Sequence, residues 1–141
     1  MLQRVQNFSA RIILQLPRRA HITPALYCLH WLPVELRIQY KMMLFVFKCL
    51  NGYAPDYLCN SLVIHEPTRS LRSANNTMSL EVPRFRTETY GRKRFGVLAP
   101  ILWNELPPDL KLLDSVDNFK DKLKHYYFCQ YFVQERFDHL V

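Results

Sequence analysis

The chain has 141 residues, of which 49% are hydrophobic, and a formal net charge of +7. This hydrophobic content argues against wholesale disorder, and the length allows one domain, or a piece of a larger protein, with a modest core. Residues 1–94 carry 14 Lys and Arg against 5 Asp and Glu, whereas residues 95–141 carry 5 against 7. The first two thirds are therefore the candidate nucleic-acid face.

Residues 2–16 are predicted to form an amphipathic helix, because apolar residues recur there at helical spacing. The face consists of Leu2, Val5, Ser9, Ile12 and Leu16, widened by Phe8 and Ile13. Pro17 ends this helix, since the residue before a proline is pushed out of the α region. A hydroxyl N-cap at Thr23, followed by Pro24, then favours a short helix over residues 24–29.

Residues 33–51 are predicted to form a long buried helix around which the rest of the chain is organised. Its apolar residues step by four, four, three and four: Val34, Ile38, Met42, Phe45 and Cys49. The pair Asn51-Gly52 favours a left-handed stop at the end of the helix. Residues 42–47 are apolar on every side, so other elements should enclose them. Another short helix is expected over residues 55–62.

The pattern changes after residue 62. Residues 63–77 are rich in Pro, Ser and Asn and are predicted to form a loop. Met78, Leu80 and Val82 alternate with polar residues, which indicates a strand, and Pro83 limits it to a sheet edge. We expect a second extended run at 94–98 to pair with it across a turn as a small β-hairpin.

The most basic segment of the chain is residues 69–94, with a local net charge of +5. Its candidate nucleic-acid-binding residues are Arg69, Arg72, Arg84, Arg86, Arg92, Lys93 and Arg94. Tyr90 and Phe95 lie among these cations, a mixture suited to backbone contact plus base stacking. The alternative interpretation is a charged loop that is merely solvated. The segment has no Gly-rich phosphate loop, so binding would be electrostatic.

Residues 99–133 form a Trp/Pro segment followed by a last helix. Trp103 is predicted to be a core anchor, because apolar residues surround it. Ser115 caps the helix, whose apolar residues again recur at helical spacing: Val116, Phe119, Leu123, Tyr126 and Tyr127. Residues 134–141 are expected to be a frayed tail.

Together these patterns predict a mainly α fold with a small β-hairpin, a single small domain built around the long central helix. Its parts would be a helical part at 2–62, the basic loop and hairpin at 63–98, the segment at 99–133 and the tail. Four widely spaced cysteines, Cys28, Cys49, Cys59 and Cys129, are expected to be buried thiols in a reducing compartment. They lack the close pairing of zinc ligands, so we expect no metal and no cofactor. Without an apolar leader or a membrane-crossing run, the chain should lie in the cytoplasm or nucleus.

Several short strings occur in a characteristic order. In the first half they are Leu-Gln-Arg-Val-Gln-Asn at 2–7, His-Ile-Thr-Pro at 21–24, Leu-His-Trp-Leu-Pro-Val at 29–34 and Leu-Asn-Gly-Tyr-Ala-Pro at 50–55. In the second half they are Arg-Ser-Leu-Arg-Ser at 69–73, Val-Pro-Arg at 82–84 and Ala-Pro-Ile-Leu-Trp-Asn-Glu-Leu-Pro at 99–107. Over residues 2–133 the chain closely resembles the C-terminal, post-polymerase region of non-LTR (LINE-like, jockey-type) retrotransposon reverse transcriptases.

The resemblance implies a position downstream of the polymerase fingers, palm and thumb, in a protein that copies its RNA onto nicked target DNA. The chain has no Tyr-x-Asp-Asp motif, no adjacent aspartate pair to hold two catalytic metals and no endonuclease-like constellation. We therefore expect no enzyme activity from the chain alone.

Two classes of function remain open. The first is a nucleic-acid-binding accessory segment that helps the polymerase core of the parent protein to hold RNA or DNA, weakly and with little sequence preference. The second is a non-functional retroelement remnant, or a domesticated protein-interaction module, in which the cations only maintain solubility. Neither class involves a membrane.

Overall fold

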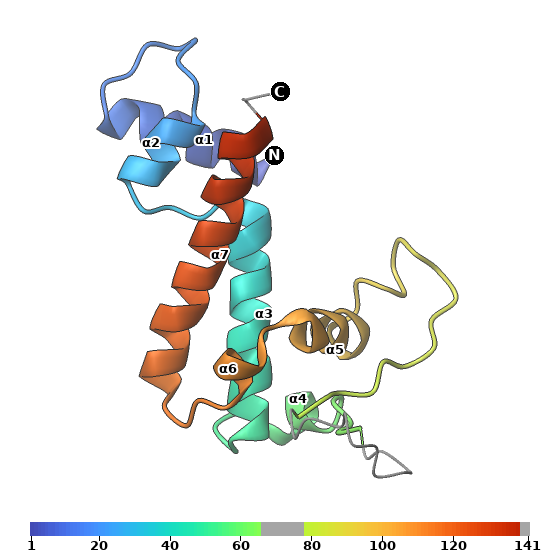
Figure 1. Ribbon diagram of the computed structural model, residues 1–141. Coiled ribbons are helices and arrows are strands. Elements are labelled where there is room, and N and C mark those ends of the chain that lie inside the picture. Colours follow the sequence, from blue (N-terminus) through green and yellow to red (C-terminus); the bar gives the residue numbers. More distant parts are fainter. Residues whose placement is uncertain (66–77, 139–141) are drawn as a thin grey trace. The chain divides into compact units, whose positions relative to one another are not determined.

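The computed structural model describes residues 1–65 and 78–138 of the chain, and it is mainly helical (Figure 1). Its helices are α1 Leu2–Ile13, α2 Thr23–Cys28, α3 Val34–Leu50, α4 Asp56–Cys59, α5 Phe95–Glu105, α6 Pro108–Lys111 and α7 Val116–Asp138. The helices expected near residues 2–16, 24–29, 33–51 and 55–62 are all present, and most are shorter than predicted. The last helix is longer, since α7 continues to Asp138, into the stretch expected to be a frayed tail.

The chain divides into two compact units, whereas the sequence led us to expect one domain. The first unit is Met1–Tyr40 with Leu123–Val141, and the second is Lys41–Lys122. The division runs through α3 and α7, so each of these helices contributes one part to each unit. The units are described separately below.

The first three helices end in the same left-handed turn. Gly52 follows α3 with φ of 74°, and the Tyr53 N–H donates to the Lys48 carbonyl at 2.8 Å, which is the Schellman pattern expected from Asn51-Gly52. Gln15 and His30 adopt the same conformation after α1 and α2, with φ of 51° and 52°. Helix α1 therefore ends at Ile13, before the position that Pro17 indicated, because Gln15 takes the left-handed conformation.

The core of the first unit lies between α1, α2 and the C-terminal part of α7. Ala10, Ala25, Leu26 and Phe132 form its buried cluster. The ring of Tyr27 lies 5.3 Å from that of Phe128 and 5.2 Å from that of Phe132, centre to centre. Ala10 of α1 and Ala25 of α2 are small, which allows the elements of this cluster to pack closely.

The core of the second unit is built on aromatic contacts between α3, α5 and the start of α7. The rings of Phe47 and Phe119 stack with centres 4.1 Å apart, and Trp103 lies 6.1 Å from Phe119. Trp103 is 1% exposed, and its indole N–H donates to the Met78 carbonyl at 2.8 Å. The prediction that Trp103 is a core anchor is confirmed.

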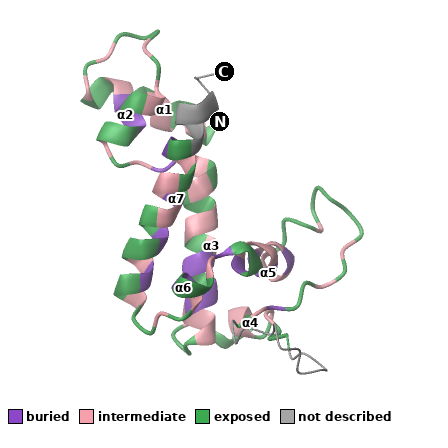
Figure 2. Cartoon of the chain, in the orientation of Figure 1, coloured by how far each residue is buried: buried purple, intermediate pink, exposed green. Residues whose placement is uncertain are grey.

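The predicted buried face of the central helix is wrong. Ile38 and Phe45 are 53% and 46% exposed, whereas the buried residues of α3 are Met43, Leu44, Val46 and Phe47 (Figure 2). Met43, Val46 and Phe47 also recur at helical spacing, so residues 42–47 offer two competing apolar faces. Periodicity could not choose between them, and the stacking of Phe47 on Phe119 does.

The predicted β-hairpin is not formed. Residues 95–98, expected to be its second strand, are the first turn of α5. The extended run around Leu80 instead makes a single antiparallel bridge with Ile64, flanked by bonds from His65 N–H to the Ser79 carbonyl and from Glu81 N–H to the Val63 carbonyl, both 2.8 Å. A short apolar run suits a buried helix as well as a strand, which explains the error at 94–98.

Candidate nucleic-acid interface

We call residues 83–94 the basic loop. The segment just before it is held at Leu80 by a side chain of α5. Asn104 accepts the Leu80 N–H through Oδ1 at 2.9 Å and donates Nδ2–H to the Leu80 carbonyl at 2.8 Å. This amide occupies the position that a second strand would take and satisfies both backbone groups of Leu80, which is 2% exposed. Sequence reasoning missed Asn104, because a single amide carries no spacing signal.

A tight turn lies within the basic loop, in the part that leads into α5. The Gly91 N–H donates to the Thr87 hydroxyl at 2.9 Å, and the Arg92 N–H donates to the Thr87 carbonyl at 3.0 Å. A Cβ atom added at Gly91 would lie 2.7 Å from the Thr87 carbonyl oxygen, so the turn requires glycine. Arg92, Lys93 and Arg94 follow this turn and directly precede the first residue of α5, Phe95.

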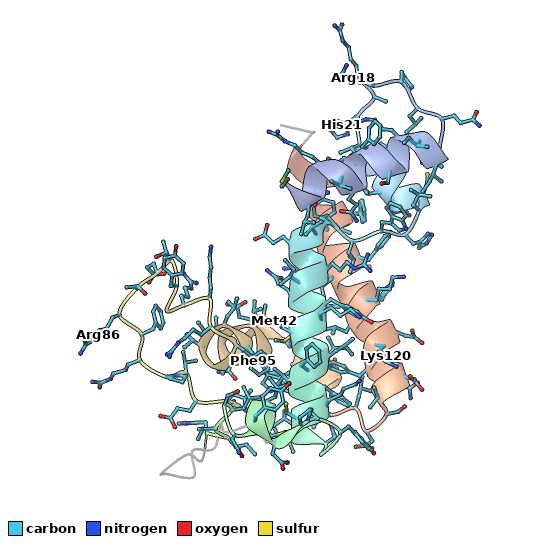
Figure 3. The ribbon with its side chains drawn as sticks, turned by 180° about the vertical axis from the view of Figure 1, so that it is seen from behind. Arg18, His21, Met42, Arg86, Phe95 and Lys120 are labelled. Carbon is cyan, nitrogen blue, oxygen red and sulfur yellow. The ribbon has the colours of Figure 1, made fainter. Side chains whose placement is uncertain are left out.

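The five described candidate cations are exposed: Arg84, Arg86, Arg92, Lys93 and Arg94. Figure 3 shows the labelled Arg86 pointing away from the loop. The other two, Arg69 and Arg72, lie outside the described residues. Residues 84–94 carry these five cations and one carboxylate, Glu88, for a net charge of +4.

One ion pair lies within the basic loop among the described residues. Arg92 Nη1 lies 3.2 Å from Glu88 Oε2, and the two side chains are 52% and 72% exposed. A pair this exposed contributes about 0–1 kcal/mol and is easily exchanged for another anion. The positive charge of the loop therefore remains largely uncompensated by the part of the chain that is described.

The two aromatic residues predicted to stack on bases differ in accessibility. Tyr90 is 85% exposed, so its ring is open to stacking. Phe95 is only partly exposed and is the first residue of α5. Tyr90 is thus the aromatic residue of the pair that the geometry makes available to a nucleic acid.

The start of α5 adds to the positive field of the loop. Its N-cap, Arg94, provides no side-chain cap, and its first turn contains no acidic residue. The N-terminal end of a helix carries a partial positive charge from its unpaired N–H groups. Three cations and this end of the dipole therefore follow one another along the chain, an arrangement that attracts phosphate groups without reading bases.

The cysteines do not match the expected buried thiols. Cys28 is exposed, and Cys49, Cys59 and Cys129 are partly exposed. Burial, a hydrogen bond that the protonated Cys49 thiol makes with Cys59, and the charge of Cys59 raise the pKa of Cys49 to about 12. Among the side chains that the structure describes, at residues 1–65 and 78–133, no three His, Cys, Asp or Glu are grouped as metal ligands.

Comparison with protein families, curated proteins and solved structures finds no match to this chain. Within the part of the chain that the structure describes, no helix has both the length and the apolar character needed to cross a membrane.

Proposed function

We propose that this chain is the C-terminal accessory segment of a non-LTR retrotransposon reverse transcriptase, and that it assists RNA or DNA binding without catalysing a reaction by itself. The ordered motifs at residues 2–107 motivate the family assignment. The observation that carries the binding role is the exposed, largely unpaired cations of a loop that begins just after the Asn104 contact at Leu80, contains the Thr87–Gly91 turn and continues directly into α5. Its site of action would be the cytoplasm or nucleus.

The binding is weak and tolerant of sequence. Arg84, Arg86 and the three cations before α5 contact phosphates, and phosphate contacts position a protein without specifying bases. The exposed ring of Tyr90 adds a stacking contact that accepts any base. The Asn104 contact at Leu80 and the internal turn from Thr87 to Gly91 limit the conformational freedom that the loop loses on binding, which favours affinity.

The polymerase core of the parent protein is the proposed second partner. Phe45 is 46% exposed on a helix that is otherwise part of the core of the second unit. We propose that the polymerase core covers this side chain. The nucleic-acid contact and the protein contact would then use different elements.

A second candidate function is a domesticated protein-interaction module, or a remnant without function. The observation that favours an interaction module is the exposure of large apolar side chains on α1, among them Phe8 at 64% and Ile12 at 60%. In this case the basic loop only contributes solubility.

Salt-titrated fluorescence anisotropy with single-stranded RNA separates these functions. Affinity for a single strand should fall with a log–log slope of about −0.7 per phosphate contacted. The variant R92A/K93A/R94A should reduce the magnitude of that slope by roughly two units and keep the native fold, because its side chains are exposed.

The matched control is R4A/R18A/R19A, which removes the same charge from exposed positions in the first unit. We expect its slope to stay close to that of the wild-type chain. Equal slopes for the two triple variants would contradict a specific nucleic-acid surface at the basic loop. The wild-type chain, given primer, template, nucleotides and Mg²⁺, should not extend the primer.

A further inference from the structure

Helix α1 packs on the first unit through its polar side. The Gln3 side-chain oxygen accepts the Val34 N–H at 2.8 Å, and the Gln6 side-chain amide donates to the Leu32 carbonyl at 2.8 Å. Ala10, on the same side of the helix, is fully buried. The side that faces inward is therefore made of two glutamines and an alanine.

Another side of α1 consists of exposed apolar residues; Figure 2 shows the exposed residues of this helix in green. Its side chains are more than half exposed: Leu2 68%, Val5 60%, Phe8 64%, Ile12 60% and Ile13 54%. We call these five residues the α1 face. An amphipathic helix ordinarily turns such a face into its own core. Contiguous exposed apolar side chains of this kind mark an interaction surface.

The spacing within the α1 face suits another helix. Leu2, Val5, Ser9 and Ile12 follow one another at intervals of three, four and three, the spacing of a coiled-coil seam. Residues 5, 8, 9 and 12 form the four corners into which a side chain of a facing helix inserts. One of these four corners is the small Ser9. Its hydroxyl already donates to the Val5 carbonyl at 3.0 Å, so a partner helix that covers Ser9 leaves its hydroxyl paired.

The charge beside the α1 face selects the partner. Arg4 and Arg11 lie along the edge next to Phe8, and α1 contains no acidic residue. Arg4 is exposed, whereas Arg11 is partly buried and its guanidinium donates to the Ala20 carbonyl at 3.2 Å, so Arg4 is the more accessible of the two charges. Residues 1–40 carry five arginines against one glutamate. A second copy of the chain, docked face to face, would bring like charges together, which disfavours self-association.

We propose that the α1 face binds an amphipathic helix of a partner protein whose carboxylates lie along the edge opposite Arg4 and Arg11. The partner's apolar side chains fill the seam between Leu2 and Ile12, and its acidic edge fixes its orientation. This inference does not depend on the nucleic-acid role of the basic loop, since the two surfaces share no residue.

The test uses two fluorescein-labelled helical peptides of three heptads with the full chain. Both have Leu at the a and d positions; one has Glu and the other Lys at the e and g positions, where like charges disfavour pairing of the peptide with itself. The Glu peptide should bind at least about tenfold more tightly than the Lys peptide. The variant V5S/I12S should weaken binding of the Glu peptide by at least about tenfold.

The matched control is V63S/V82S, which removes two partly exposed valines from the second unit. It should bind the Glu peptide as the wild-type chain does, and circular dichroism should show that both variants remain helical. Failure of the wild-type chain to bind the Glu peptide, or equal binding of the two peptides, would overturn the proposal. So would a wild-type dimer in light scattering that V5S/I12S converts to a monomer, or binding to anionic lipid vesicles without binding to the peptide.

Discussion

Helices α1 and α5 differ in the burial of their apolar residues. In α5 the apolar residues surround the helix, and Val97, Ala99, Pro100 and Trp103 are buried within the second unit. In α1 the apolar residues keep to one side, and Ala10 is the one buried residue. Helix α5 is held by packing, whereas α1 is held partly by two hydrogen bonds, one that Gln3 accepts and one that Gln6 donates. Apolar residues at helical spacing therefore predict an apolar helix face. They do not show whether that face packs in the core of the same chain.

The largest effect is expected in the enclosed helix. Replacing Trp103 with alanine removes its packing against Phe119 and leaves the Met78 carbonyl without its indole donor. The free energy of unfolding should fall by about 3–5 kcal/mol, measured by urea denaturation. The open helix provides the contrast, since V5S/I12S should change stability by about 0.5 kcal/mol or less. Equal losses in the two variants would remove the distinction between α1 and α5.

An intermediate effect is expected at Asn104, which joins α5 to the basic loop. Asn104→Ala deletes both hydrogen bonds to the Leu80 backbone and leaves two buried groups without partners. The cost should be about 1–3 kcal/mol. Amide hydrogen exchange offers a local readout, because the Leu80 N–H should lose protection before the amides of α5 do. Unchanged protection at Leu80 would show that the side chain does not hold this segment.

A smaller effect is expected at Phe45, on the uncovered side of α3. Phe45→Ala should cost less than about 1 kcal/mol, because the side chain is 46% exposed. Phe47→Ala, two residues further along, should cost about 3–5 kcal/mol, since its ring is buried and stacked on Phe119. Thermal denaturation of both variants compares the stability that each face of α3 contributes. A larger loss of stability in Phe45→Ala than in Phe47→Ala would show that the Phe45 face is the buried one.

The last effect concerns reactivity and not stability. Burial, with the hydrogen bond and charge of Cys59, raises the pKa of Cys49 to about 12, so this thiol stays protonated at pH 9. Iodoacetamide should therefore modify exposed Cys28 well before Cys49 at that pH. Cys59→Ala removes two of the three causes and should speed modification of Cys49, whereas Cys129→Ala should not. Identical rates at Cys49 with and without Cys59, measured by peptide mass spectrometry, would show that the thiols do not interact.

Local signals predicted where α1 to α4 and α7 lie, whereas α5 and α6 were not predicted as helices. Proline and glycine marked the ends of α2 and α3 to within a residue or two, because these signals act over one turn. The predicted hydroxyl N-cap at Thr23 is wrong, since Thr23 is the first residue of α2 and Ile22 is its N-cap, without a side-chain cap bond. The buried side of α3 depended on Phe119, more than 70 residues away in the chain, and no spacing within α3 contains that information. The hairpin prediction failed for a related reason, since Asn104 on a helix satisfies the backbone that a strand was expected to pair with.

The candidate site was predictable as a segment and not as a structure. The run of cations at residues 84–94 is evident in the sequence, and their exposure follows from the cost of burying unpaired charge. The turn closed by Thr87 and Gly91 was not predicted, because its sequence also suits a hairpin turn. Sequence alone also treated Tyr90 and Phe95 as equivalent, whereas the start of α5 leaves only Tyr90 well exposed.

Chemical-shift mapping of the isotope-labelled chain, titrated with single-stranded RNA, tests the central claim most directly. If the basic loop is the nucleic-acid surface, the amide signals of residues 84–95 should move progressively with added RNA, and Tyr90 should move among the most. The signals of α1, whose uncovered surface is apolar, should stay in place. Shifts concentrated at Arg18 and Arg19, or spread evenly over the chain, would contradict the assignment of nucleic-acid binding to the basic loop.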